Sequence, residues 1–124
     1  MTYQKYAPAI ARIGVGFVFL VFGIWQLVSP EGWFGYLPSF VLNTGVSAST
    51  FILFNGIFDL VIGLLLILGL FLKVASVLGI LHILGIVYSL GWNDVAVRDI
   101  GLLIVLISVL FNGPDDFCLQ KKRR

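Results

Sequence analysis

The sequence predicts an all-α fold, namely a transmembrane four-helix bundle with N and C termini cytoplasmic. Of its 124 residues, 60% are hydrophobic and 11% are charged, whereas soluble domains contain about 25% charged residues. The chain also contains four long apolar stretches, and about 20 apolar residues in a helix span a bilayer core. We therefore expect residues 1–124 to form a single integral membrane domain.

The four spans are expected at about residues 8–28, 48–72, 74–92 and 94–112. Pro8 suits the opening turn of the first helix. The apolar run within that helix is longer than the roughly 7–15 residues typical of a signal peptide, so we interpret it as a retained membrane helix.

Short connections define the other spans. Only Lys73 separates the second span from the third, which predicts a tight antiparallel hairpin. Asn93 or Asp94 is a suitable N-cap for the fourth span. Asn112-Gly113-Pro114 is a typical helix end.

The basic residues predict the orientation. With four crossings, seven of the eight lysines and arginines lie on one side, and Arg98 alone lies on the other. The positive-inside rule places the seven in the cytoplasm. These residues are Lys5, Arg12, Lys73, Lys121, Lys122, Arg123 and Arg124.

The connecting segments differ in character. The outer loop, 29–47, carries Trp33, Phe34 and Tyr36, aromatic residues of the kind that lie at the headgroup level. This loop is interpreted as an interfacial anchor, with a lid over an outward-facing pocket as the alternative. The tail, 113–124, is expected to be a solvated cytoplasmic end.

Each predicted helix has one stripe of small and polar residues at helical spacing. Such stripes allow close helix packing and hydrogen bonds between helices. We expect them to converge on the bundle axis; the alternative is that some face a partner subunit. The stripes are Arg12, Gly16, Phe19, Gly23 and Gln26; Ile52, Asn55 or Gly56, Asp59 and Gly63; Ala75, Gly79, His82, Ile86 and Ser89; and Arg98, Gly101, Val105, Ser108 and Asn112.

Asp59 lies near the middle of its span, where an ionisable side chain costs roughly 2.5–3.5 kcal/mol and needs a partner. It is either a packing acid or a proton-accepting, ligand-orienting group. His82 is expected at a similar depth, bonded across helices rather than bound to haem. The candidate polar cluster consists of Gln26, Asn55, Asp59, His82, Ser89, Arg98 and Asp99.

Several kinds of chemistry are excluded or unsupported. Cys118 is the only cysteine, so the chain has no intramolecular disulfide and no CxxC pair. We find no catalytic triad, no phosphate loop and no metal-binding spacing of histidines. Arg98-Asp99 is either an outer helix end or a substrate clamp. A nucleic-acid-binding face is also absent.

Three segments carry a family resemblance. They are Arg12-Ile13-Gly14 through Phe22-Gly23-Ile24-Trp25-Gln26, then Phe58-Asp59-Leu60-Val61-Ile62-Gly63-Leu64, and Arg98-Asp99-Ile100-Gly101-Leu102-Leu103 with Asn112-Gly113-Pro114-Asp115-Asp116. Together they resemble the DoxX-like family of small four-helix integral membrane proteins. Gln26 and Asp59 depart from the lysine and glutamate common in that family.

The resemblance implies a protein associated with oxidoreductase systems, such as a thiosulfate:quinone oxidoreductase subunit or an oxidative-stress complex. We therefore expect an accessory subunit of a membrane oxidoreductase in a prokaryotic plasma membrane, not catalytic alone. We expect no intrinsic cofactor but a site for a quinone or lipid, and we expect the lipid bilayer and other membrane protein subunits as partners. The alternatives are a small proton-coupled transporter and a structural packing subunit.

Overall fold

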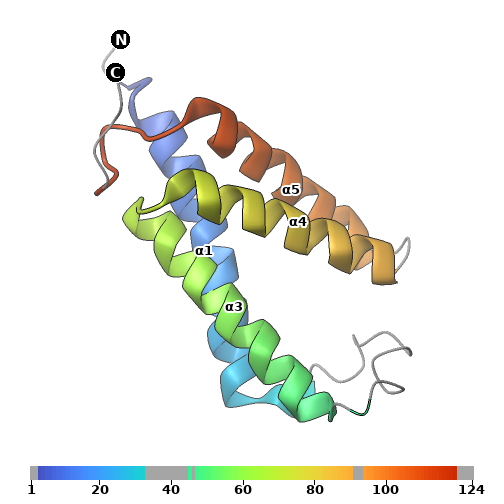
Figure 1. Ribbon diagram of the computed structural model, residues 1–124. Helices are drawn as coiled ribbons and strands as arrows, with labels where there is room; N and C mark the ends of the chain where they lie inside the picture. Colours follow the sequence, from blue (N-terminus) through green and yellow to red (C-terminus); the bar gives the residue numbers. More distant parts are fainter. Residues whose placement is uncertain (1–2, 33–44, 46, 91–93, 120–124) are drawn as a thin grey trace.

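The computed structural model describes residues 3–32, 45, 47–90 and 94–119, without the side chains of residues 89, 90 and 95. Within these ranges the chain forms α-helices and no strand, which confirms the predicted all-α class (Figure 1). The helices are α1 (Tyr6–Val28), α3 (Ala48–Leu68), α4 (Leu72–Leu90) and α5 (Asp94–Asn112). Most of the predicted loop 29–47, the Asn93 cap and the basic residues 121–124 lie outside the described residues.

Two of the helices meet the length and composition expected of a membrane span. These are α1 and α3, whereas the apolar part of α4, Leu72–Tyr88, is shorter. The beginning of α1, the α3–α4 connection and the segment after α5 lie at one end of the molecule (Figure 1). The four membrane crossings and the cytoplasmic location of both termini remain predictions.

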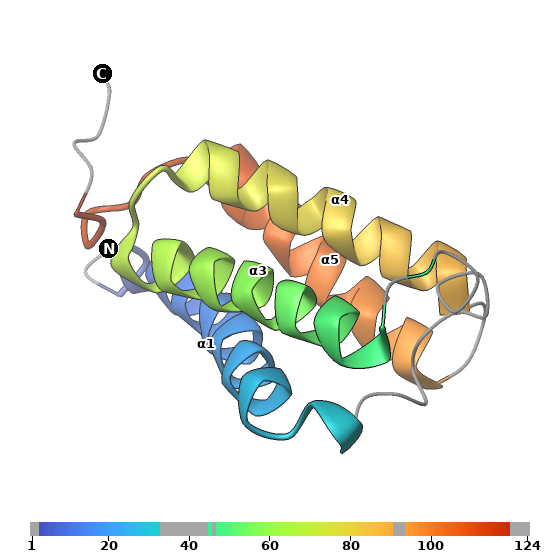
Figure 2. The ribbon, with the colours of Figure 1, turned by 60° about the horizontal axis from the view of Figure 1, so that its bottom comes forward.

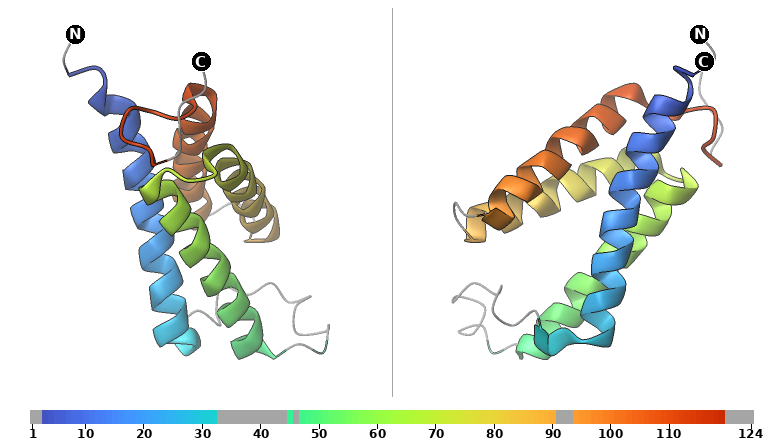
Figure 3. Two further views of the ribbon diagram at one scale, coloured as in Figure 1. Left: turned by 60° about the vertical axis from the view of Figure 1, so that its left-hand side comes forward. Right: turned by 180° about the vertical axis from the view of Figure 1, so that it is seen from behind.

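The helices are arranged as two antiparallel pairs, α1 with α3 and α4 with α5 (Figure 2). The pairs meet near the termini and diverge toward the opposite end (Figures 1 and 3). The predicted tight hairpin of the second and third helices is therefore wrong, because α4 turns away from α3 and packs mainly on α5.

The α3–α4 connection also lies earlier in the chain than predicted. Helix α3 ends at Leu68 because Gly69 adopts the left-handed conformation with φ 71°, and its N–H donates to Leu65. Phe71 also has a positive φ, 48°. Lys73 lies in the first turn of α4 rather than in the turn.

Glycines bring α1 and α3 into backbone contact. A Cβ added to Gly23 would lie 2.6 Å from the backbone nitrogen of Leu60, and one added to Gly63 would lie 2.6 Å from that of Leu20. The same pattern, with slightly longer contacts, is found at Gly16 and Gly56. Each helix thus presents two glycines, seven residues apart, to the glycines of the other.

The predicted stripes of the first three helices are largely buried. On α1 all five members are buried, from Arg12 to Gln26. On α3 the stripe contributes Ile52, Gly56, Asp59 and Gly63 to the interior. On α4, Ala75 and Gly79 are buried and His82 is partly buried.

The predicted stripe of α5 is wrong. Arg98, Gly101, Ser108 and Asn112 are exposed. The buried face of α5 carries Ala96, Asp99, Leu106 and Val109 instead. This face is set by apolar packing, in which Leu106 joins the core formed by α1, α3 and α4.

Arg12 forms the main polar contact at the termini end, and it is 1% exposed. Its Nη1 donates to the carbonyl oxygens of Leu66 and Ile67 at 2.7 Å each. These carbonyls belong to the last turn of α3, where the helix dipole favours a cation. Its Nε and Nη2 donate to the two carboxylate oxygens of Asp115 at 2.8 and 3.3 Å.

The segment after α5 folds back onto this arginine, so the prediction of a solvated tail is wrong at Asp115, which is buried, whereas Asp116, Phe117 and Leu119 are exposed. Asp115 is buried and accepts a further hydrogen bond from the backbone N–H of Phe117 at 2.8 Å. The N–H of Leu119 donates to the carbonyl of Leu68 at 3.0 Å. We call Arg12, Asp115 and the end of α3 the clasp.

We predict that Gly63→Ala destabilises the fold by about 1–3 kcal/mol, since the new methyl group overpacks the α1–α3 contact. Thermal unfolding in a mild detergent measures the change. Gly14→Ala is the matched control, because nothing lies within 4 Å of its added Cβ. Equal stability of the two variants would contradict the close contact.

We predict that Asp115→Asn lowers the free energy of unfolding by about 3 kcal/mol at neutral pH, because it leaves a buried arginine without its counter-charge. Burial raises the pKa of Asp115, but the hydrogen bonds from Arg12 and Phe117 outweigh burial and hold the pKa below 3.8. The charged form therefore stabilises the fold fully above about pH 3.8.

This stabilisation is lost as the pH falls through the lowered pKa, so the difference between wild type and Asp115→Asn should narrow below about pH 3.8. Denaturation in detergent across pH 2–7 tests this expectation. Glu31→Gln, at an exposed carboxylate, should show no such narrowing. A constant difference would show that the ion pair does not cause the loss.

Candidate functional site

Four predicted polar residues from three helices meet where the two helix pairs begin to diverge. Gln26 lies near the end of α1, and Asn55 and Asp59 lie one turn apart on α3. His82 comes from the middle of α4. Gln26 and Asp59 are 2% and 5% exposed, so the group is largely enclosed by apolar helices.

Gln26 connects the members of this group. Its Nε2 donates to Asp59 Oδ2 at 2.9 Å and to the Phe22 carbonyl one turn back at 3.1 Å. Its Oε1 accepts from Asn55 Nδ2 at 2.6 Å. Asn55 Nδ2 also approaches Asp59 Oδ2 at 3.5 Å. The close approach of α1 and α3 at Gly23 and Gly56 makes these short bonds possible.

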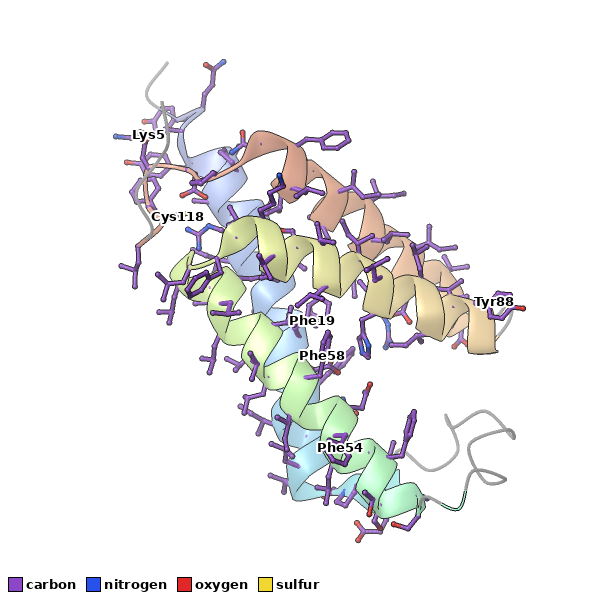
Figure 4. All side chains as sticks on the ribbon, in the orientation of Figure 1. Lys5, Phe19, Phe54, Phe58, Tyr88 and Cys118 are labelled. Atoms are coloured by element: carbon purple, nitrogen blue, oxygen red, sulfur yellow. The ribbon has the colours of Figure 1, made fainter. Side chains whose placement is uncertain are left out.

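His82 completes the group from α4. Its Nε2 lies 3.1 Å from Asp59 Oδ1, which is within ion-pairing distance. The alignment is not that of a hydrogen bond, and neither atom has a hydrogen-bond partner among the described residues. The imidazole also contacts the ring of Phe58, with centroids 4.7 Å apart, and Figure 4 shows Phe58 on the side of α3 toward α4.

The remaining predicted residues take no part in these hydrogen bonds, although Asp99 on α5 lies near enough to Asp59 and His82 to interact electrostatically with both. Arg98 Nε lies 3.5 Å from Asp99 Oδ1, and the arginine side chain is half exposed. Its guanidinium lies 4.9 Å from the ring of Phe22 on α1. Asp99 is buried. The side chain of Ser89 lies outside the described residues.

The site offers hydrogen-bonding and proton-transfer groups rather than metal ligands. Within the described residues no three His, Cys, Asp or Glu side chains come together as a metal site would require. Amides, a carboxylate and an imidazole can hold a polar head group or share a proton.

The sequence analysis missed a buried ion pair, a buried hydroxyl group and a surface groove. The Arg12–Asp115 pair could have been suggested by an arginine within an apolar span, which requires a counter-charge. Ser76 is fully buried, and its hydroxyl has no partner among the described residues. Exposed Ser108 and Asn112 line a groove of about 240 Å³ beside Ala7, Pro8 and Ala11, at the termini end.

Comparison with known families agrees with this architecture. The family model described as DoxX matches residues 7–92. The chain belongs to the DoxX family. No curated protein and no solved structure matches the chain significantly. Family membership and the two long apolar helices together indicate a small membrane protein.

We predict that Gln26→Leu destabilises the fold by about 1–3 kcal/mol, since it removes a donor from the buried Asp59 and an acceptor from Asn55. Adding Asp59→Leu should recover part of the loss, because the unsatisfied carboxylate is then gone. Unfolding in detergent measures both variants, with exposed Gln4→Leu as the control. Additive losses in the double variant would contradict a direct coupling.

Proposed function

We propose that this DoxX protein is a small accessory subunit of a membrane oxidoreductase system, and that its buried polar group binds a quinone or lipid head group. The observation that carries the proposal is the group of Gln26, Asn55, Asp59 and His82, gathered within an apolar bundle. Buried polar groups in membrane helices are costly and mark functional sites by default.

The composition of the site favours binding over independent catalysis. The sequence has one cysteine, so the chain cannot transfer electrons through a cysteine pair of its own. A partner enzyme would supply the redox centre, and this chain would position the lipid-soluble reactant. The site would face the extracytoplasmic half of the membrane, since the termini are expected in the cytoplasm.

Partial exposure of the site supports ligand access. The side chain of His82 is 19% exposed, against 8% for Asp59. The imidazole thus lies at the edge of the group, and it is next to the apolar ring of Phe58. This combination of an aromatic wall and a polar edge suits a ring-shaped head group carried on an apolar chain.

A second candidate, a small proton-coupled transporter, is favoured by one contact. His82 and Asp59 lie 3.1 Å apart, close enough to exchange a proton. Substrate flux into liposomes that requires an imposed pH gradient and disappears in Asp59→Asn would favour transport over redox support.

Purification from its native membrane in a mild detergent tests the main proposal. We expect mass spectrometry to detect a bound quinone or lipid and at least one oxidoreductase subunit. His82→Phe should reduce the retained ligand by about tenfold, the effect of losing roughly 1.4 kcal/mol. Tyr88→Phe is the control, because Tyr88 lies at the far end of α4 (Figure 4) and is 92% exposed. Absence of both ligand and oxidoreductase would contradict the proposal.

A further inference from the structure

We infer that a second copy of this chain docks on the outer face of α5, so that Phe111 of each copy fills the groove between α1 and α5 of the other. This inference goes beyond the proposed function and does not involve the polar group around Asp59. It follows from a protruding ring and a groove that lie at the same level of one helix.

The groove lies between the beginning of α1 and the end of α5. Figure 3 shows α5 beside α1 near the termini and apart from it toward the opposite end. A cavity of about 150 Å³ accepts a benzene-sized ring, so a groove of about 240 Å³ has room for a phenyl side chain. Its lining consists mainly of short side chains, namely Ala7, Pro8 and Ala11 from α1 and Ser108, Val109 and Asn112 from α5.

Phe111 projects from the turn of α5 that lines this groove, and it is 84% exposed. Successive residues of an α-helix lie about 100° apart around its axis. Phe111 therefore lies about 60° from Ser108 in one direction, and the groove residue Val109 lies about 100° from Ser108 in the other. The ring and the groove are thus on opposite flanks of α5, and Phe111 does not fill the groove of its own copy.

A two-fold axis along the membrane normal matches this arrangement. Such an axis keeps every residue at its own depth, and both copies present the same patch to each other. When two α5 helices face each other across the axis, the Phe111 flank of one lies against the groove flank of the other. Because the ring and the groove share one level, both ring-to-groove contacts form at once.

The surface between the two flanks allows close approach. Gly101 and Ser108 are exposed and lie seven residues apart, and a Cβ added to Gly101 would meet nothing within 4 Å. The glycines through which α1 contacts α3, Gly16 and Gly23, have the same spacing. Helices associate in membranes through close packing of this kind, so two α5 helices can approach until each Phe111 reaches the groove.

A second copy explains these features better than a lipid does. The outward positions of α1 carry large apolar residues, such as Ile10, Phe17 and Val21, as lipid contact requires. An acyl chain in the groove would need neither a protruding ring on the opposite flank nor small residues between the flanks. A second copy uses all three.

Single-molecule photobleaching of the full chain in phosphatidylcholine liposomes, at a series of protein-to-lipid ratios, tests the inference. We expect dimers, and Phe111→Ala should raise their dissociation constant about thirtyfold, as for the loss of a central anchor residue. Phe54→Ala is the matched control, because Phe54 is 70% exposed on α3 (Figure 4) and should not affect the dimer.

The groove is tested separately by filling it. Ala7→Phe places a ring of the same copy at the groove and should weaken the dimer to a similar extent. Ile10→Phe is its control, because Ile10 is 69% exposed on α1 and does not line the groove.

Disulfide trapping tests the contact directly. Cys118 is the only cysteine, so Cys118→Ser provides a background without thiols. In that background, copies with Phe111→Cys mixed with copies with Ala7→Cys should form a disulfide between copies on oxidation, because the two positions lie in contact across the interface. Phe54→Cys mixed with Ala7→Cys should not.

The outcomes decide the inference without affecting the proposed function, which His82→Phe tests. Monomers at every ratio would overturn the inference and leave the groove to lipid. Dimers that withstand both Phe111→Ala and Ala7→Phe would place the contact on another face and overturn it as well. Because Ala7→Phe alters the other half of the contact, the inference remains testable if Phe111→Ala fails to fold.

Discussion

The close contact between the backbones of α1 and α3 is the feature on which the clasp and the polar group around Asp59 both depend. Gly16 and Gly63 form one contact, and Gly23 and Gly56 form the other. The first contact lies near Arg12, which reaches the carbonyls at the end of α3. The second lies beside Gln26, which reaches Asp59. A side chain at these glycines would separate the helices and lengthen both sets of hydrogen bonds.

The clasp and the polar group around Asp59 meet the same physical requirement in different ways. In a membrane interior a polar atom must be satisfied by the protein. The clasp achieves this fully for Arg12, which uses two carbonyls and both oxygens of one carboxylate. In the site around Asp59, Oδ1 and His82 Nε2 approach to 3.1 Å without the alignment of a hydrogen bond. The clasp is therefore the more completely hydrogen-bonded of the two groups.

Sequence reasoning located the helices and much of the site because both follow from local patterns. The spacing of Gly16, Gly23 and Gln26 on one side of α1 was readable, as was that of Gly56, Asp59 and Gly63 on α3. The face of α5 was not, since the polar stripe with Arg98 and Ser108 was expected on the bundle axis, and these residues are exposed. The choice depends on Leu106 packing into the core, a contact between distant parts of the chain.

The conformation of the segment after α5 could not be predicted from the sequence either. Residues 113–119 have the composition of a solvated tail, and only the position of Arg12 in three dimensions makes Asp115 a buried partner. The ends of α3 and α4 were misplaced for a related reason. The turn depends on the positive φ of Gly69 and on Cys118, whose Cα lies 2.6 Å from where a Gly69 side chain would begin.

The clasp has a consequence for biosynthesis. Arg12 is translated early, but its carboxylate partner follows 103 residues later. Until Asp115 has left the ribosome, the arginine in the first helix lacks the carboxylate that pairs with it in the folded protein. The clasp therefore forms only after the segment that follows α5 has been made, and a truncation that removes Asp115 would leave a first helix that never reaches its native electrostatic balance.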